Sequence, residues 1–175
     1  MTLPQFILAD AALHHQQLVE LNMEYLGWVL DGFGKITGKS AFDMLGMDLA
    51  PYVESTVNKV CGDAPPRGAF YLVEFDGALA GMGGLRFVRS GVAEVKRIYV
   101  RPAFRGKRLG DAILQRILND AKSYGYQRMV LDTAPFMQSA QRVYEQHGFL
   151  DRPPYDEVEA PKELHPFIRF MEKAL

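Results

Sequence analysis

The sixteen residues Val95–Gly110, VKRIYVRPAFRGKRLG, decide how this chain folds. The apolar residues up to Val100 predict a strand, Pro102 stops it, and a helical apolar spacing begins at Leu109. A basic turn that contains glycine joins the two elements. Because the start of a helix has unpaired N–H groups and the positive end of the dipole, this turn is a candidate phosphate-binding site. A basic turn that is merely solvated is the alternative.

The elements around this stretch predict a mixed sheet. A strand meander precedes the helix, and a short apolar strand follows it, so the last meander strand, the helix and the apolar strand form a βαβ unit with parallel strands. Asp76-Gly77 is a strong hairpin signal between the first two meander strands. The predicted elements are the strands Ala69–Phe75, Ala78–Val88 and Val92–Val100, the helix Leu109–Tyr124 and the strand Arg128–Thr133.

The remaining segments complete an α/β domain. Apolar residues at helical spacing predict a helix over residues 11–30, with Asp10 as a candidate cap and Gly32, Gly34 and Gly38 as its end. The other predicted elements are a strand at Gln5–Ala9, a helical stretch over residues 40–60 with Pro51 in its first turn, a helix at Met137–His147, and strands from Phe149 and over His165–Met171. We expect one domain over residues 1–175, with a mostly antiparallel sheet, one parallel βαβ unit and about four flanking helices.

Composition narrows the function. The chain has 175 residues, 48% of them hydrophobic, and a net charge of −1, which argues against a general nucleic-acid binder. Its apolar runs are shorter than a membrane helix requires, and its first residues lack a secretory signal, so we expect a soluble, cytoplasmic protein without a membrane partner. One cysteine and four histidines without metal-ligand spacing predict no metal.

Two motifs resemble one known family. Arg105, Gly106 and Gly110 match the pattern Gln/Arg-x-x-Gly-x-Gly/Ala, although Arg108 stands where the pattern has its middle glycine. Further on, Ala140–Phe149 reads AQRVYEQHGF, a late helix that ends in a tyrosine followed by Gly-Phe. In this order the two motifs resemble the GCN5-related N-acetyltransferases. The resemblance implies that the first motif binds the pyrophosphate of acetyl-CoA.

The same resemblance implies which residues bind the cofactor. The backbone N–H of Ile98 would meet the thioester carbonyl, and Val100 would align the pantetheine in the manner of an added strand. The implied acetyl-CoA-binding residues are Ile98, Val100, Arg105, Gly106, Lys107, Arg108, Leu109 and Gly110.

Two residues are candidates for the proton transfers. Period-two alternation places Glu94, Lys96, Ile98 and Val100 on one face of a strand. The resemblance implies that Glu94, four residues before Ile98, is a candidate general base, directly or through water. A solvated or Lys96-paired carboxylate is the alternative. The resemblance implies that Tyr144 is the general acid that protonates the departing thiolate, and a core tyrosine is the alternative.

The acceptor side carries weaker signals. The resemblance places Tyr25 and Trp28 near the acceptor, although core packing is the better explanation for both. Asp132 ends a parallel strand, where ligand crevices of α/β sheets open, but a turn or cap role also fits. We predict an enzyme that transfers acetyl from acetyl-CoA directly to an amine of a small molecule or peptide. A catalytically silent acyl-CoA-binding sensor is the alternative, and a homodimer stays open.

Overall fold

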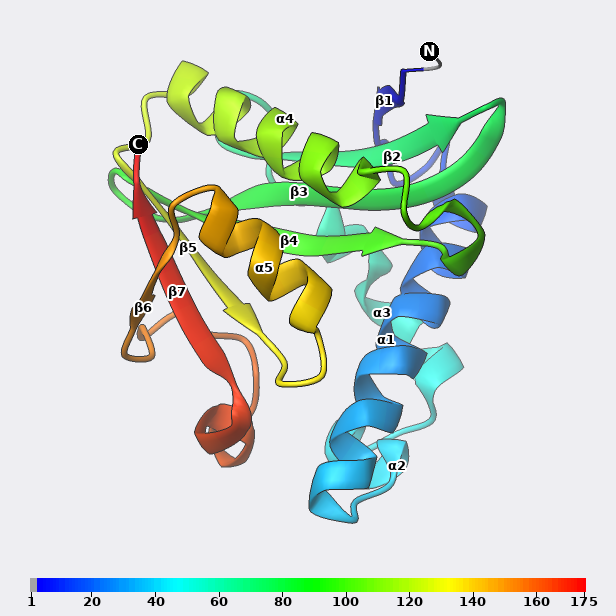
Figure 1. The fold of residues 1–175 in the computed structure, drawn as a ribbon. Helices are drawn as coiled ribbons and strands as arrows, with labels where there is room; N and C mark the ends of the chain where they lie inside the picture. Colours follow the sequence, from blue (N-terminus) through cyan, green and yellow to red (C-terminus); the bar gives the residue numbers. More distant parts are fainter. Residues whose placement is uncertain (1–2) are drawn as a thin grey trace.

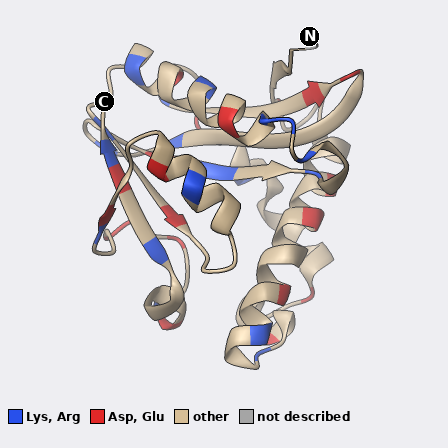
Figure 2. Cartoon of the chain, viewed as in Figure 1, with Lys and Arg blue, Asp and Glu red and all other residues tan. Residues whose placement is uncertain are grey.

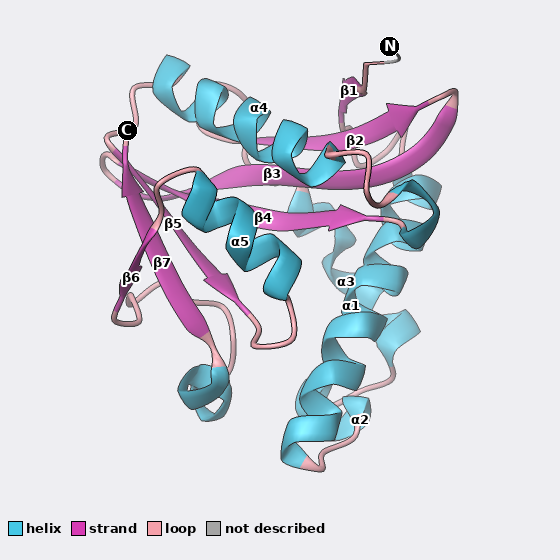
Figure 3. Cartoon of the chain, in the orientation of Figure 1, coloured by secondary structure: helices cyan, strands magenta, loops and turns pink. Residues whose placement is uncertain are grey.

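A seven-stranded sheet forms the centre of the protein in a computed structural model that describes residues 3–175 (Figure 1, Figure 3). The strands are β1 (Gln5–Leu8), β2 (Ala69–Phe75), β3 (Ala78–Arg89), β4 (Val92–Val100), β5 (Arg128–Thr133), β6 (Leu150–Arg152) and β7 (Arg169–Ala174). Their order in the sheet is β1-β2-β3-β4-β5-β7-β6. Neighbouring strands run antiparallel except β4 and β5, which are parallel. The predicted mixed sheet with one parallel βαβ unit is therefore confirmed.

Within residues 3–175, five α-helices flank this sheet, where the sequence predicted about four. They are α1 (His15–Thr37), α2 (Ala41–Leu45), α3 (Leu49–Val60), α4 (Leu109–Ser123) and α5 (Gln138–Gln146). The extra helix arises because Gly46 adopts a left-handed conformation, with φ +74°, and divides the stretch predicted as one helix into α2 and α3. Pro51 lies in the first turn of α3, as expected.

Helix α1 is longer than the prediction and starts later. Asp10 caps a turn before the helix, where its Oδ1 accepts hydrogen bonds from the N–H groups of Ala12 and Leu13. Gly32 lies inside the helix, because the Phe136 ring packs so closely that a Cβ at this position would be 2.3 Å from it. The helix ends at Gly38, whose φ of +73° is left-handed. The tertiary contact with Phe136 explains why a glycine does not end the helix early.

The C-terminal strand also shifts relative to the sequence prediction. Residues Lys162–Phe167 form a 3₁₀ turn that contains Pro166, and β7 starts after it, at Arg169 rather than at His165. Proline has no N–H to donate to a strand ladder, which accounts for the later start. Of the helices within residues 3–175, none combines the length and hydropathy that a bilayer crossing requires.

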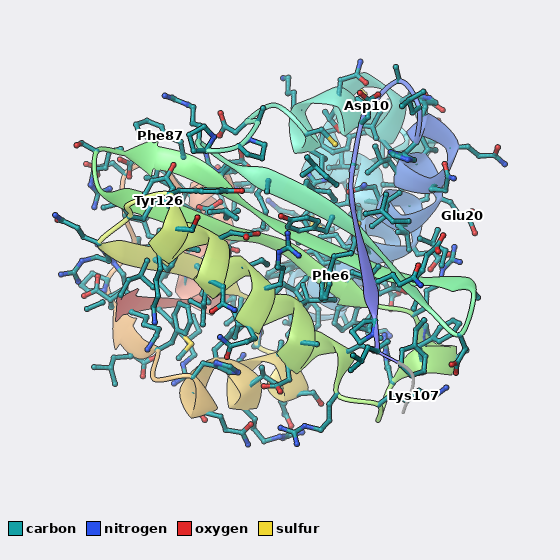
Figure 4. The ribbon with its side chains drawn as sticks, turned by 90° about the horizontal axis from the view of Figure 1, so that it is seen from above. Phe6, Asp10, Glu20, Phe87, Lys107 and Tyr126 are labelled. Atoms are coloured by element: carbon teal, nitrogen blue, oxygen red, sulfur yellow. The ribbon has the colours of Figure 1, made fainter. Side chains whose placement is uncertain are left out.

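The two faces of the sheet bury separate cores. In β2, the side chains of Tyr71 and Val73 pack on the face covered by α4 and α5, while Phe70 and Leu72 pack on the face covered by α1 and α3. Figure 4 shows α4 and α5 on their face from above, with Phe6 of β1 labelled beside the sheet. The two helix layers therefore hold β4 between them.

A bulge in β4 changes which side chains share a face. Arg97 has a positive φ of +45°, and the register against β3 shifts between the pairs Gly84↔Lys96 and Met82↔Tyr99. One extra residue on β4 reverses the alternation beyond this point. Ile98 and Val100 consequently pack on the α4 face, whereas Glu94 lies on the opposite face. The prediction that all of them share one face is wrong.

Beyond the bulge, β4 and β5 separate. Their ladder consists of three pairs, the last being Glu94↔Val130, although β4 continues to Val100 and β5 to Thr133. Figure 1 shows the two strands diverging towards their carboxyl ends. The edge of β4 that faces this gap is left without a strand partner, which makes it available to an extended ligand.

Candidate active site

A cavity of about 700 Å³ lies between β4, the start of α4 and the helix α5. Its walls include seven of the eight residues that the sequence assigned to acetyl-CoA, namely Ile98, Val100, Arg105, Gly106, Arg108, Leu109 and Gly110. The opposite wall is formed by the segment from Phe136 to Ala140 and by Tyr144. The structure thus brings the two sequence motifs together around one space.

The turn between β4 and α4 is shaped to bind an anion. Gly106 and Arg108 both have left-handed φ angles, +78° and +60°, so the backbone enters the left-handed region at two positions before α4 begins. Arg108 is the N-cap residue of α4 and its side chain makes no capping hydrogen bond. The N–H groups of the first helical turn therefore lack a side-chain partner, while Leu109 and Gly110 line the cavity.

The space around Gly110 indicates whether this turn can accept a diphosphate. A Cβ added at Gly110 would meet no protein atom within 4 Å, so packing within the protein does not require a glycine here. Glycine near a helix start is less stable than alanine by up to ~1 kcal/mol. Gly110 itself lines the cavity, and because the space beside its Cα is open, a phosphate group there could approach the backbone closely. The residues present therefore fit the diphosphate of a CoA ester.

Figure 2 shows basic residues in blue on the turn between β4 and α4. The three cations of this turn differ in their partners. Arg105 donates from Nε to the Val100 carbonyl at 3.2 Å, and it has no carboxylate partner among residues 3–175. Arg108 lies 3.3 Å from Asp111 Oδ2. Lys107 is not brought into the cavity: its Nζ lies 3.9 Å from Asp76 Oδ2, at the outer edge of the molecule in Figure 4. Arg105 is therefore the cation best placed to meet a phosphate.

Tyr144 reaches the cavity from α5. Its ring is buried against Phe149, with 5.8 Å between the ring centroids. Its hydroxyl makes no hydrogen bond with any residue that the structure describes, and the residue lines the cavity. Burial raises the pKa of Tyr144 above its usual value, so the phenol keeps its proton at neutral pH. The arrangement presents an O–H donor to whatever occupies the cavity.

Glu94 lies outside this cavity, in a hydrogen-bonded cluster. Its Oε1 accepts from Arg86 Nε at 2.8 Å, and its Oε2 accepts from Arg86 Nη2 at 3.2 Å and from the Tyr155 hydroxyl at 2.6 Å. The carboxylate is buried, so it is neither solvated nor paired with Lys96, which instead binds Glu159. The two alternatives for Glu94, a solvated carboxylate and a pair with Lys96, are therefore wrong.

The aromatic candidates occupy two places. Trp28 lines the cavity, in contact with Phe136 and Tyr99, whose ring centroids lie 5.8 and 6.4 Å away. Tyr25 packs against Tyr99 at 6.0 Å, outside the cavity wall. Burial, followed by the charge of Asp132, raises the pKa of Tyr25 to about 12. Trp28 is thus placed to contact a ligand, while Tyr25 lies outside the cavity wall.

Asp132 lies on β5, two residues beyond Val130, which forms the last pair with β4. Its side chain is exposed to solvent, and it makes no hydrogen bond or ion pair with residues 3–175. The surrounding protein nevertheless removes enough water for burial to raise the pKa of Asp132 to about 6, with the charge of Glu94 as the second cause. This carboxylate is unpaired at the point where the strands separate.

Sequence reasoning missed part of the cavity wall. Phe136, in the connection after β5, and Gln138 and Ser139, in the first turn of α5, line the cavity. Their position past the carboxyl end of a parallel strand is a signal that could have indicated them. The partners of Glu94 carry no such signal, because Arg86 and Tyr155 reach it from other parts of the chain.

Residues 40–149 match the model of the Acetyltransferase (GNAT) family. The chain belongs to this family. An "IAA acetyltransferase" of Azospirillum brasilense is 32% identical over 113 residues, which cover 64% of this chain and 71% of the relative. An uncharacterized N-acetyltransferase of Schizosaccharomyces pombe is 33% identical over 130 residues, which cover 72% of this chain and 79% of the relative.

A solved structure shares the fold of this GNAT protein. The PaiA N-acetyltransferase of Thermoplasma acidophilum, in complex with coenzyme A, superimposes with a TM-score of 0.73 at 16% identity and 99% coverage of both chains. The predicted fold and family are therefore confirmed, and the protein is an acetyltransferase of the GNAT family.

Proposed function

We propose that this GNAT protein transfers acetyl from acetyl-CoA directly to an amine of a small molecule or a peptide, with residues 1–175 acting as one N-acetyltransferase domain. One observation carries the proposal: a single cavity has an uncapped helix start at one end and the free Tyr144 hydroxyl in its wall. Arg105, Gly106 and the backbone from Arg108 to Gly110 would hold the diphosphate, with Arg105 as the principal cation. Ile98 and Val100 would hold the pantetheine arm.

The strand gap supports the placement of the thioester arm. When bound, acetyl-CoA supplies an activated acetyl group that a neutral amine can attack. The unpartnered edge of β4 past Glu94 can pair with pantetheine as an added strand would, which is the role proposed for Val100. The N–H of Ile98 would donate to the carbonyl oxygen as negative charge develops there.

Tyr144 would stabilise the departing sulfur. A thiol has a pKa of about 8.5, and the pKa of an ordinary tyrosine is already higher. Burial raises the pKa of Tyr144 further, which widens the difference. Full proton transfer from Tyr144 to the thiolate is therefore less favourable than it would be for an ordinary tyrosine. The hydroxyl would donate a hydrogen bond to the sulfur as its charge develops, and deliver the proton as the thiolate leaves.

Replacing Arg105 with alanine should weaken coenzyme A binding by about 3- to 10-fold, because one exposed charge-assisted contact to phosphate is lost. Binding of a pantetheine fragment without the diphosphate should stay unchanged. Calorimetric titration of both ligands checks this, with Lys107→Ala as the matched control because that ammonium lies outside the cavity. Equal losses for the two ligands in Arg105→Ala would contradict the phosphate assignment.

The proposed reaction is tested by thiol release. The protein is given acetyl-CoA with a panel of amines: amino acids, polyamines, aromatic amines and peptides with free N-termini. Release of coenzyme A thiol that depends on one class of amine, together with the acetylated product by mass spectrometry, supports the proposal. Binding of acetyl-CoA without thiol release across the panel would favour the silent sensor instead.

A further inference from the structure

The proposed reaction needs a group that takes a proton. An alkyl amine with a pKa of about 10.4 is neutral about once in 2,500 molecules at pH 7, and its nitrogen becomes strongly acidic as it bonds to the acetyl carbon. A carboxylate near the strand gap could accept that proton. The inference below rests on the proposed function, and it concerns which carboxylate acts.

Glu94 is poorly arranged for this task. Three donor atoms, two from Arg86 and one from Tyr155, already bind its two oxygens at 2.6 to 3.2 Å. The bidentate arginine pair and the phenol therefore already occupy the two oxygens that would have to receive the proton. The residue is also buried. Its contacts are those of a structural ion pair.

Asp132 has the complementary features. It lies on β5, two residues beyond Val130, which makes the last pair with β4, so it stands where the strands begin to separate. Its side chain is exposed and has no hydrogen-bond or ion-pair partner within residues 3–175. After burial, the charge of Asp132 is a further cause that raises the pKa of Tyr25 of α1 and of Tyr144 of α5. Asp132 is therefore an unpaired carboxylate at the gap between β4 and β5.

We propose that Asp132 is the proton acceptor of the reaction, acting directly or through one water molecule. As the nitrogen–carbon bond forms and the carbon–sulfur bond breaks, the nitrogen loses one proton to the Asp132 carboxylate. The sulfur receives one proton from the Tyr144 hydroxyl. Exchange with solvent then returns a proton from Asp132 to Tyr144, so the products are an amide and a free thiol.

The surroundings of Asp132 suit a base at neutral pH. The titratable and charged groups around it are Arg86 of β3, Glu94 and Lys96 of β4, Tyr25 of α1, Tyr144 of α5, and Tyr155 and Glu159 of the segment before β7. Burial and the Glu94 charge raise the pKa of Asp132 to about 6, whereas Lys96 and Arg86 oppose that shift. Above that pH the carboxylate is ionised and ready to accept a proton.

Replacing Asp132 with asparagine should lower kcat roughly 100-fold at pH 7.5, the effect of losing a general base. The wild-type kcat should decrease as the pH is lowered through about 6, because the Asp132 carboxylate becomes protonated there. In Asp132→Asn this decrease, the acidic limb of the pH–rate profile, should be absent. Coenzyme A affinity should be unchanged, because Asp132 is outside the cavity wall. The profile is measured by thiol release from pH 5 to 9 with the amine found in the panel.

Glu94→Gln is the matched variant. It should keep the acidic limb but lower the melting temperature, because it leaves Arg86 without its bidentate partner. Asp132→Asn should show the opposite pattern. The folded protein disfavours the ionised form of Asp132, so wild-type stability decreases as pH rises from 4 through 6; the asparagine variant lacks this loss and should melt no earlier than wild type at pH 8.

The outcomes separate the two proposals. Wild-type turnover with an acidic limb that survives in Asp132→Asn, or that disappears in Glu94→Gln alone, would overturn the role of Asp132 while leaving the reaction intact. A wild-type protein that releases no thiol with any amine would overturn the proposed function and this role together. A well-folded Asp132→Asn variant with full activity would also overturn it.

Discussion

Replacing Tyr144 with phenylalanine is expected to lower kcat about 10- to 1,000-fold while acetyl-CoA binds as tightly as before. The substitution removes a hydroxyl that has no hydrogen-bond partner among the described residues and leaves the ring against Phe149. The fold therefore loses no internal hydrogen bond. What is lost is the donor that would meet the departing sulfur, so the effect should fall on turnover and not on binding.

Thiol release under saturating acetyl-CoA, together with calorimetric titration of coenzyme A, measures the two quantities separately. Tyr126→Phe is a suitable control, because that hydroxyl donates to the Arg67 carbonyl, away from the cavity. It should change stability slightly and leave kcat as it is. A Tyr144→Phe variant with unchanged kcat would return Tyr144 to a packing role.

The elements of the sheet were predictable because their signals are local. Strands β2, β4 and β5 have the bounds that alternation and the Asp76-Gly77 turn predict. Helix α1 differs because the reason for Gly32 is the ring of Phe136, which comes from the far end of β5. A sequence shows that a glycine is present, but it does not show whether the glycine ends a helix or admits a neighbour.

The candidate site also has a part that the sequence predicts and a part that depends on distant contacts. The turn from Arg105 to Gly110 is one continuous segment, and seven of the eight predicted ligand residues line the cavity. The face of Glu94 could not be predicted, because the bulge at Arg97 places a positive φ on a residue other than glycine. The arginine and tyrosine that bind Glu94, and the absence of such partners at Asp132 within residues 3–175, depend on the packing of distant strands.

Changing Gly110 to alanine should have opposite effects on stability and on ligand binding. The free energy of unfolding should rise by ~0.4–1 kcal/mol, because alanine restricts the unfolded chain and the added Cβ meets no protein atom within 4 Å. The affinity for coenzyme A should fall at least about tenfold, or ~1.4 kcal/mol, since the methyl group would stand where the diphosphate approaches the backbone.

Urea unfolding without ligand and calorimetric titration of coenzyme A measure the two effects. Gly125→Ala is the matched control: that glycine has a φ of +84° past the end of α4, so alanine there should destabilise the fold by ~1 kcal/mol and leave coenzyme A affinity unchanged. Destabilisation cannot explain weaker binding in a variant that is more stable than wild type. If Gly110→Ala bound coenzyme A as tightly as the wild type, the backbone of this turn would not be the surface that meets the diphosphate.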